Sequence, residues 1–184
     1  ADVRAWDLWL PDGKPQPGTE EIVATLDAVL ALDATHPLAN HLYIHAIEAG
    51  TQPGRADAAA DALRDRLPGL GHLVHMPSHI DVRRGRWQEA IVANTKAIAA
   101  DRAYTANAPE QGFYRLYLAH NHHMLTYGAM MTGQSRIALA SIREKGLLPR
   151  GGKGADEAGE MSSMLAVGDR AASVFMAPAK DFAL

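Results

Sequence analysis

The stretch TEEIVATLDAVLALD places its apolar residues three and four positions apart, which puts them on one face of a helix. Thr19 precedes two glutamates, and this order predicts an N-cap followed by negative charge at the helix N-terminus. Segments with a helical pattern follow along most of the chain. We predict seven helices, at residues 19–33, 38–49, 54–66, 71–84, 87–101, 114–131 and 134–146.

The composition supports a helical protein. Of the 184 residues, 47% are hydrophobic, many of these are alanine, and only 6% are aromatic. Alanine and leucine favour helices that pack closely on one another. The length suits one domain or a compact array of repeats.

Two segments of the chain match at an offset of 34 residues. His41 then falls on His75, and His45 falls on His79. The small or apolar positions Ala56 and Leu63 fall on Ala90 and Ala97, a spacing typical of paired helices. A period of 34 residues is that of the tetratricopeptide (TPR) repeat.

The second unit contains Gly85, Trp87 and Ala90 in the pattern Gly-x-Trp-x-x-Ala, which resembles the most recognisable part of the TPR motif. Gly133 and Ala138 stand at the equivalent places of a third unit. The resemblance implies an all-α, TPR-like helix-turn-helix solenoid of about three repeats, with partial or capping helices at both ends. We expect the following organisation: units at about 37–70, 71–104 and 119–150, an insertion at 105–118, a repeat domain over 1–150, and a glycine-rich linker with a C-terminal capping helix over 151–184.

Eight of the nine histidines lie in the predicted first helices of the three units. Positions three or four apart share one face of a helix. First helices of successive TPR units lie side by side, so matched positions should be neighbours. We therefore expect a row of His41, His75 and His123, beside a second row of His45, His79 and Tyr127.

Such rows favour a metal site, because two imidazoles on adjacent helices can reach one ion. Neutral imidazole suits copper, zinc, iron and nickel, and the absence of cysteine excludes a thiolate ligand. The all-nitrogen set favours copper, with zinc next, and a dinuclear centre of this kind would support oxidase-type chemistry. A zinc ion would instead activate water, with Glu48 as general base. The predicted metal ligands are His41, His45, His72, His75, His79, His120 and His123.

Three segments also resemble a bacterial group of TPR-containing proteins: HPLANHLYIHAIE, GHLVHMPSHI and YLAHNHHM. The group carries them as His-Pro-x-x-x-His-x-x-x-His-x-x-Glu, Gly-His-x-x-His-Met-Pro-Ser-His and His-Asn-x-His. The resemblance covers about residues 3 to 145 and points to the same histidines and to Glu48. It implies a further helical half upstream and favours an exported or periplasmic protein, although a cytoplasmic one stays open.

Other residues are expected to have structural roles. His36 precedes Pro37 and is predicted to lie at a helix junction, and His122 is predicted to point away from the shared face. Asp81 and Asp101 are predicted to lie on the surface. The tryptophans and methionines, including Trp9, Trp87, Met76, Met124, Met130 and Met131, are predicted to serve packing.

Two alternatives to a catalytic metal centre stay open. One is a TPR scaffold that binds a peptide or small molecule in its groove, with histidines that make binding depend on pH. The other is a metal store or carrier without catalysis. A duplicated structural pair would also repeat the histidines. The net charge of −3 does not favour nucleic acid, and no apolar run is long enough to span a bilayer.

Overall fold

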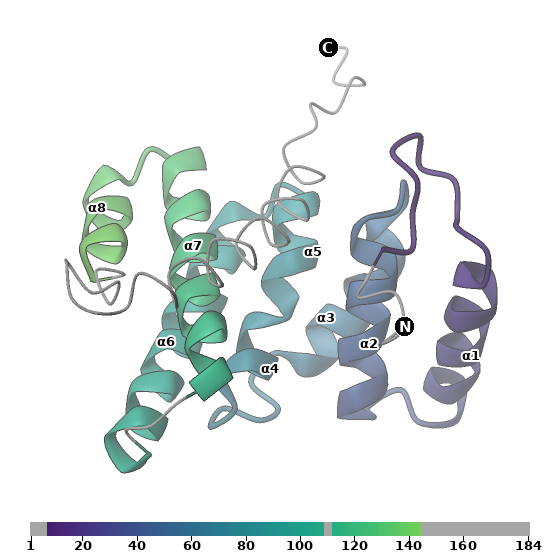
Figure 1. The fold of residues 1–184 in the computed structure, drawn as a ribbon, viewed down its shortest axis with the longest axis horizontal. Helices are drawn as coiled ribbons and strands as arrows, with labels where there is room; N and C mark the ends of the chain where they lie inside the picture. Colours follow the sequence, from purple (N-terminus) through teal and green to yellow (C-terminus); the bar gives the residue numbers. More distant parts are fainter. Residues whose placement is uncertain (1–6, 109–111, 145–184) are drawn as a thin grey trace. The chain divides into compact units, whose positions relative to one another are not determined.

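The computed structural model describes residues 7–108 and 112–144, which are helical apart from turns, loops and one isolated β-bridge between Trp9 and Pro15. The helices are α1 (Thr19–Leu32), α2 (Pro37–Glu48), α3 (Asp57–Leu63), α4 (Gly71–His75), α5 (Pro77–Arg83), α6 (Trp87–Asn107), α7 (Arg115–Met131) and α8 (Ser135–Glu144), with 3-10 turns η2 (Pro53–Ala56) and η3 (Gly112–Tyr114) (Figure 1). The predicted all-α class is confirmed for this part of the chain. The predicted linker and capping helix of 151–184 lie outside the described residues.

The helices pack as successive pairs. α2 contacts α3, α4 and α5 both contact α6, and α7 contacts α8. Contacts of α2 with α5, and of α4 with α7, bring the first helix of each pair against the first helix of the next. This is the neighbour relation that the histidine prediction requires, while the solenoid itself stays a prediction.

Glycine and alanine have the roles that the repeat alignment gives them. Gly85 and Gly133 have φ values of 71° and 69°, so each ends a first helix in a conformation that other residues rarely adopt. Ala90, Ala97 and Ala138 are all buried. Small side chains at these positions let the paired helices approach each other.

The predicted helix 71–84 is interrupted. Pro77 has no amide hydrogen and cannot continue the hydrogen-bond ladder. The structure accordingly divides this segment into α4 and α5 at Met76, whose backbone stays helical with φ −51° and ψ −40°. The interruption falls between His75 and His79, so it affects how their side chains meet the neighbouring helices.

Three other helix limits differ from the prediction. Thr19 is not the N-cap of α1: Gly18 occupies that position, and the Thr19 hydroxyl donates to the carbonyl of Leu8 at 2.6 Å. α6 continues to Asn107, beyond the expected end at 101, and enters the region predicted as an insertion. The predicted helix 54–66 starts as the turn η2 and ends at Leu63.

The prediction that Asp81 and Asp101 are surface residues is wrong. Asp81 is 0% exposed and Asp101 is 1% exposed. Burying a carboxylate costs little only where cations or donors compensate it. Arg64 donates to both oxygens of Asp81 at 2.8 and 2.5 Å, and Asp101 accepts hydrogen bonds from Tyr114 and Asn121.

The packing roles predicted for the methionines hold for only two of the four named. Met76 and Met124 are buried, whereas Met130 and Met131 are 63% and 51% exposed. The exposed pair lies in the last turn of α7, where no described helix covers that face. Among the described residues, one hydrophobic cluster of buried side chains joins α1, α2, α3 and α5, and Met76 belongs to it.

Candidate metal centre

Three groups of side chains bring potential ligand atoms within 4.8 Å of one another. The first is His41, His45 and His72. The second is His75, His79 and His120. The third, His45, Glu48 and His79, shares its histidines with the first two. The members come from α2, α4, α5 and α7, so the centre lies between the first helices of the three pairs and not within one helix.

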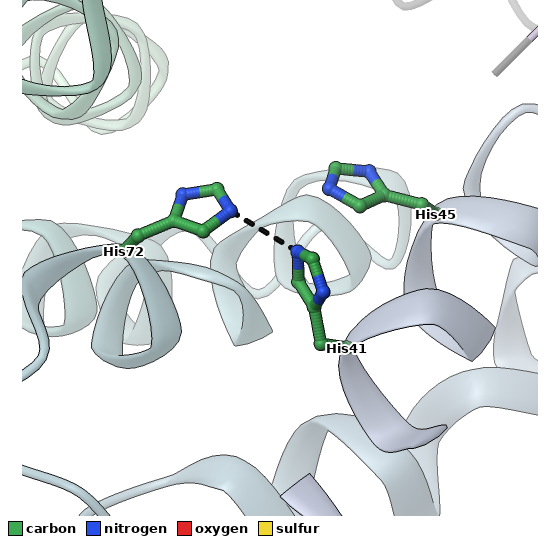
Figure 2. Close-up of side chains that lie close together, drawn as sticks. All are labelled: His41, His45 and His72. Atoms are coloured by element: carbon green, nitrogen blue, oxygen red, sulfur yellow. Dashed lines mark hydrogen bonds between the residues drawn. The ribbon is translucent and has the colours of Figure 1, made fainter. Parts of the chain in front are cut away.

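In the first group the ring of His41, on α2, faces the ring of His72, on α4 (Figure 2). Their Nε2 atoms are 3.1 Å apart, and the ring of His45 lies 4.9 Å from that of His41, centroid to centroid. The Nδ1 atoms of His41 and His72 are buried and have no hydrogen-bond partner among the described residues. The protein around them therefore does not select one tautomer for either ring.

In the second group three Nε2 atoms converge. Those of His75 and His79 are 2.7 Å apart, and that of His120 is 3.5 Å from that of His79. Two nitrogens on one tetrahedral zinc, at 2.0–2.1 Å each, lie about 3.3–3.4 Å apart, and a right-angled pair lies about 2.9 Å apart. One observed separation is shorter than both values and the other is longer than both, so the spacing is compatible with one ion bound by the three rings.

Asn94 on α6 fixes the tautomer of His75. The amide nitrogen of Asn94 donates to the carbonyl of Ala90 at 2.8 Å, which leaves its oxygen to face Nδ1 of His75, also at 2.8 Å. An oxygen acceptor at this position requires a hydrogen on Nδ1. A neutral His75 therefore carries its lone pair on Nε2, toward His79.

Glu48 fixes the tautomers of two further histidines, one from each of the first two groups. Its Oε1 accepts from Nδ1 of His45 at 2.8 Å, and its Oε2 lies against Nδ1 of His79. Although burial acts to raise it, the interactions with His79 and His45 hold the pKa of Glu48 well below its usual range. The carboxylate thus stays ionised, and in a neutral ring it directs the hydrogen to Nδ1 and the lone pair to Nε2.

These contacts leave the Nε2 lone pairs of His75 and His79 face to face across 2.7 Å. Two lone pairs repel at this separation, so the arrangement requires a cation between them, either a proton or a metal ion. A proton bridges only two atoms. The third nitrogen, from His120, adds the ligand that a metal ion uses and a proton does not.

Burial keeps the other imidazoles neutral. Burial, and after it the neighbouring histidines, lower the pKa of His41 to about 4 and those of His72 and His120 to about 3. Burial likewise places the pKa of His75 well below its ordinary value. Metal ligands must be deprotonated, so these four rings are ready to bind an ion at neutral pH.

The two predicted rows are shifted against each other. His45 does lie beside His79, with ring centroids 5.1 Å apart, but His41 meets His72 and His75 meets His120. His72 takes the place predicted for His75, and His120 takes the place predicted for His123. Each lies three positions earlier in the sequence than the alignment predicts, because packed helices cross at an angle.

Two residues of the predicted rows, His123 and Tyr127, are placed elsewhere. His123 is in none of the three groups, and its ring centroid is 6.4 Å from that of His120. Tyr127 packs against Trp87 at 5.6 Å and not beside His79. His122 points away from the shared face, as predicted, and its Nδ1 lies 3.1 Å from the hydroxyl of Ser141.

Two further expectations are confirmed. His36 caps α2, since its Nδ1 accepts the amide hydrogen of Ala39 at 3.2 Å. The indole of Trp9 donates to the carbonyl of Ala46 at 2.8 Å and so anchors the segment before α1. Asn94, in contrast, was missed by the sequence analysis, because an asparagine within a helix carries no local signal that it faces a histidine.

Comparison with protein-family models, with curated proteins and with solved structures gives no match for this chain. The resemblance to TPR proteins therefore stays a prediction. Within the described residues, no helix combines the length and the apolar character needed to cross a membrane.

Proposed function

We propose that this protein binds two transition-metal ions, one in the group His41, His45 and His72 and one in the group His75, His79 and His120. The observation that carries the proposal is the pair of Nε2 lone pairs that Asn94 and Glu48 hold face to face in the second group. Imidazole donors without thiolate favour copper, with zinc next.

The second group is proposed to bind the tighter ion. Two of its three rings have their tautomer set by a hydrogen bond, and outer contacts of this kind raise metal affinity. In the first group only His45 has such a contact among the described residues, whereas the Nδ1 atoms of His41 and His72 are buried without one. Loading in two steps is the expected result.

A pair of copper ions, each with three nitrogen ligands, would keep open coordination positions and supply oxidase-type redox chemistry. Adjacent rings support the pairing, because the centroids of His72 and His75 are 5.9 Å apart and those of His45 and His79 are 5.1 Å apart. Glu48 has one oxygen against a ring of each group. We therefore assign it a positioning role, in place of the general base expected from the sequence.

The alternatives fit the geometry less well. His75 and His79 are 0% and 5% exposed, so a peptide in an open groove would not reach them. A metal store with exchangeable ions needs little rigidity around the ligands. The contacts of Asn94 and Glu48 instead favour a fixed centre.

Elemental analysis of protein purified without a metal-affinity tag tests the proposal. We expect about two equivalents of copper after loading and dialysis. The double variant His75→Ala, His79→Ala should lose the tighter equivalent. His36→Asn is the matched control, because His36 is exposed, lies outside the three groups, and asparagine retains an N-cap acceptor. Failure of the wild-type protein to retain copper or zinc, with no change in thermal stability on adding either, would overturn the proposal.

A further inference from the structure

Three of the five tyrosines form a chain of rings that starts at the first metal group. The ring of Tyr117 lies 4.4 Å from that of His72, centroid to centroid. Tyr114 follows at 5.7 Å from Tyr117, and Tyr104 follows at 5.3 Å from Tyr114. Tyr104 is 50% exposed. The aromatic path therefore runs without a gap from a proposed metal ligand to the surface.

The middle tyrosine has a base at its hydroxyl. Tyr114 donates to Oδ1 of Asp101 at 2.7 Å, and the side chain of Asn121 donates to Oδ2 at the same distance. Burial raises the pKa of Asp101, and the hydrogen bonds from Tyr114 and Asn121 act in the opposite direction by stabilising the carboxylate. A phenol that loses an electron becomes a strong acid, so a carboxylate at this distance makes its oxidation easier by taking the proton.

Aromatic packing alone explains less of this arrangement. A phenylalanine at position 114 would fill the same space. It would place no hydroxyl group beside the carboxylate of Asp101, which is almost fully buried. The buried Asp101 is costly to maintain, since its oxygens need donors. The hydrogen-bonded pair of Tyr114 and Asp101 lies between the exposed Tyr104 and the ring that contacts His72.

We propose that Tyr104, Tyr114 and Tyr117 relay single electrons between the buried metal centre and one-electron oxidants at the surface. The proposal rests on the proposed function, because it requires a redox-active ion at His72. Electron transfer rates fall steeply with distance, and a series of closely spaced rings replaces one long step by short ones.

Each step balances in electrons and protons. An oxidant at the surface removes one electron from the tyrosine chain, and the hydroxyl proton of Tyr114 moves to Asp101. The resulting neutral tyrosyl radical takes one electron from a reduced ion through Tyr117, and Asp101 returns the proton. The net change is one electron from Cu(I) to the external oxidant, with Cu(II) left in the centre.

A flash-quench experiment on the copper(I)-loaded protein tests the relay. Tris(bipyridine)ruthenium(III), generated by light in solution, serves as the surface oxidant, and the appearance of Cu(II) is followed by its absorption and electron paramagnetic resonance. We expect Tyr114→Phe and Tyr104→Phe to slow the appearance of Cu(II) severalfold. Tyr127→Phe is the matched control, because Tyr127 packs on Trp87 and is not one of the three relay tyrosines.

The outcomes separate the relay from the metal proposal. If copper binds but both Tyr114→Phe and Tyr104→Phe oxidise it at the wild-type rate, the relay is wrong and the metal centre stands. Slowing in Tyr114→Phe alone would overturn the assignment of Tyr104 as the surface end. If no copper binds, the metal-free protein still tests the Tyr114–Asp101 pair: the ruthenium oxidant should give a tyrosyl radical signal that Tyr114→Phe diminishes, and an undiminished signal would overturn it. The copper content and thermal melt of each variant establish that it is folded.

Discussion

Replacing Glu48 with glutamine tests whether one carboxylate orients ligands of both metal groups. Glutamine has nearly the same shape but offers one acceptor oxygen and one amino group. Its single acceptor oxygen can take a hydrogen bond from Nδ1 of His45 or from Nδ1 of His79, but not from both. The ring that faces the amino group must move its own proton to Nε2, and it then loses the lone pair that binds metal.

The size of the effect follows from the two contacts. Loss of one outer hydrogen bond to a ligand lowers metal affinity by roughly 10- to 100-fold, equivalent to about 1.4–2.7 kcal/mol. Because glutamine keeps an acceptor for one of the two histidines, one binding constant should fall while the other is largely retained. We expect the product of the two constants to drop by about 10- to 100-fold.

Competition with a chromophoric chelator at fixed pH measures both constants, and elemental analysis counts the ions that remain. Asn94→Leu is the informative comparison, since Asn94 faces only His75 and should weaken one ion while the other is unchanged. His36→Asn should change neither. If Glu48→Gln binds both ions with wild-type affinity and remains folded, the orienting role of Glu48 is wrong.

Two further predictions concern the packing that holds the centre. Gly71→Ala should destabilise the protein by about 1–3 kcal/mol in urea denaturation, because the added methyl would lie 2.0 Å from Oδ1 of Asp101. Gly69→Ala, where nothing lies within 4 Å, should stay within about 0.5 kcal/mol of the wild type, and equal effects at the two glycines would contradict the close approach. Met76→Ala should cost about 2–5 kcal/mol because the side chain is fully buried, whereas the exposed Met130→Ala should cost little, and a small loss at both would mean that the core relaxes around Met76.

The sequence predicts the helices and the convergence of the histidines because both depend on local signals. Gly85 and Gly133 end helices through their own backbone conformation, and Ala90 and Ala138 permit close packing wherever the helices meet. The 34-residue offset in the sequence then predicts that His45 lies beside His79, as it does in the structure.

The finer pairing of ligands could not be predicted from the sequence. Whether His75 meets His120 or His123 depends on the crossing angle of two helices, and no residue encodes that angle by itself. The burial of Asp81 and Asp101 was missed for a related reason. Their donors, Arg64 and Tyr114, come from other segments of the chain, so a polar residue in a helical pattern looked like a surface residue.

The residues around the ligands are more informative about function than the ligands themselves. A cluster of buried histidines could arise from duplication of a structural pair, and its rings could simply share protons. Asn94 and Glu48 favour a cation site, because their oxygens face the Nδ1 atoms of three rings and so turn the Nε2 atoms inward. A proton shared between His75 and His79 would satisfy two of these nitrogens. The third nitrogen, from His120, is explained by an ion that takes three ligands.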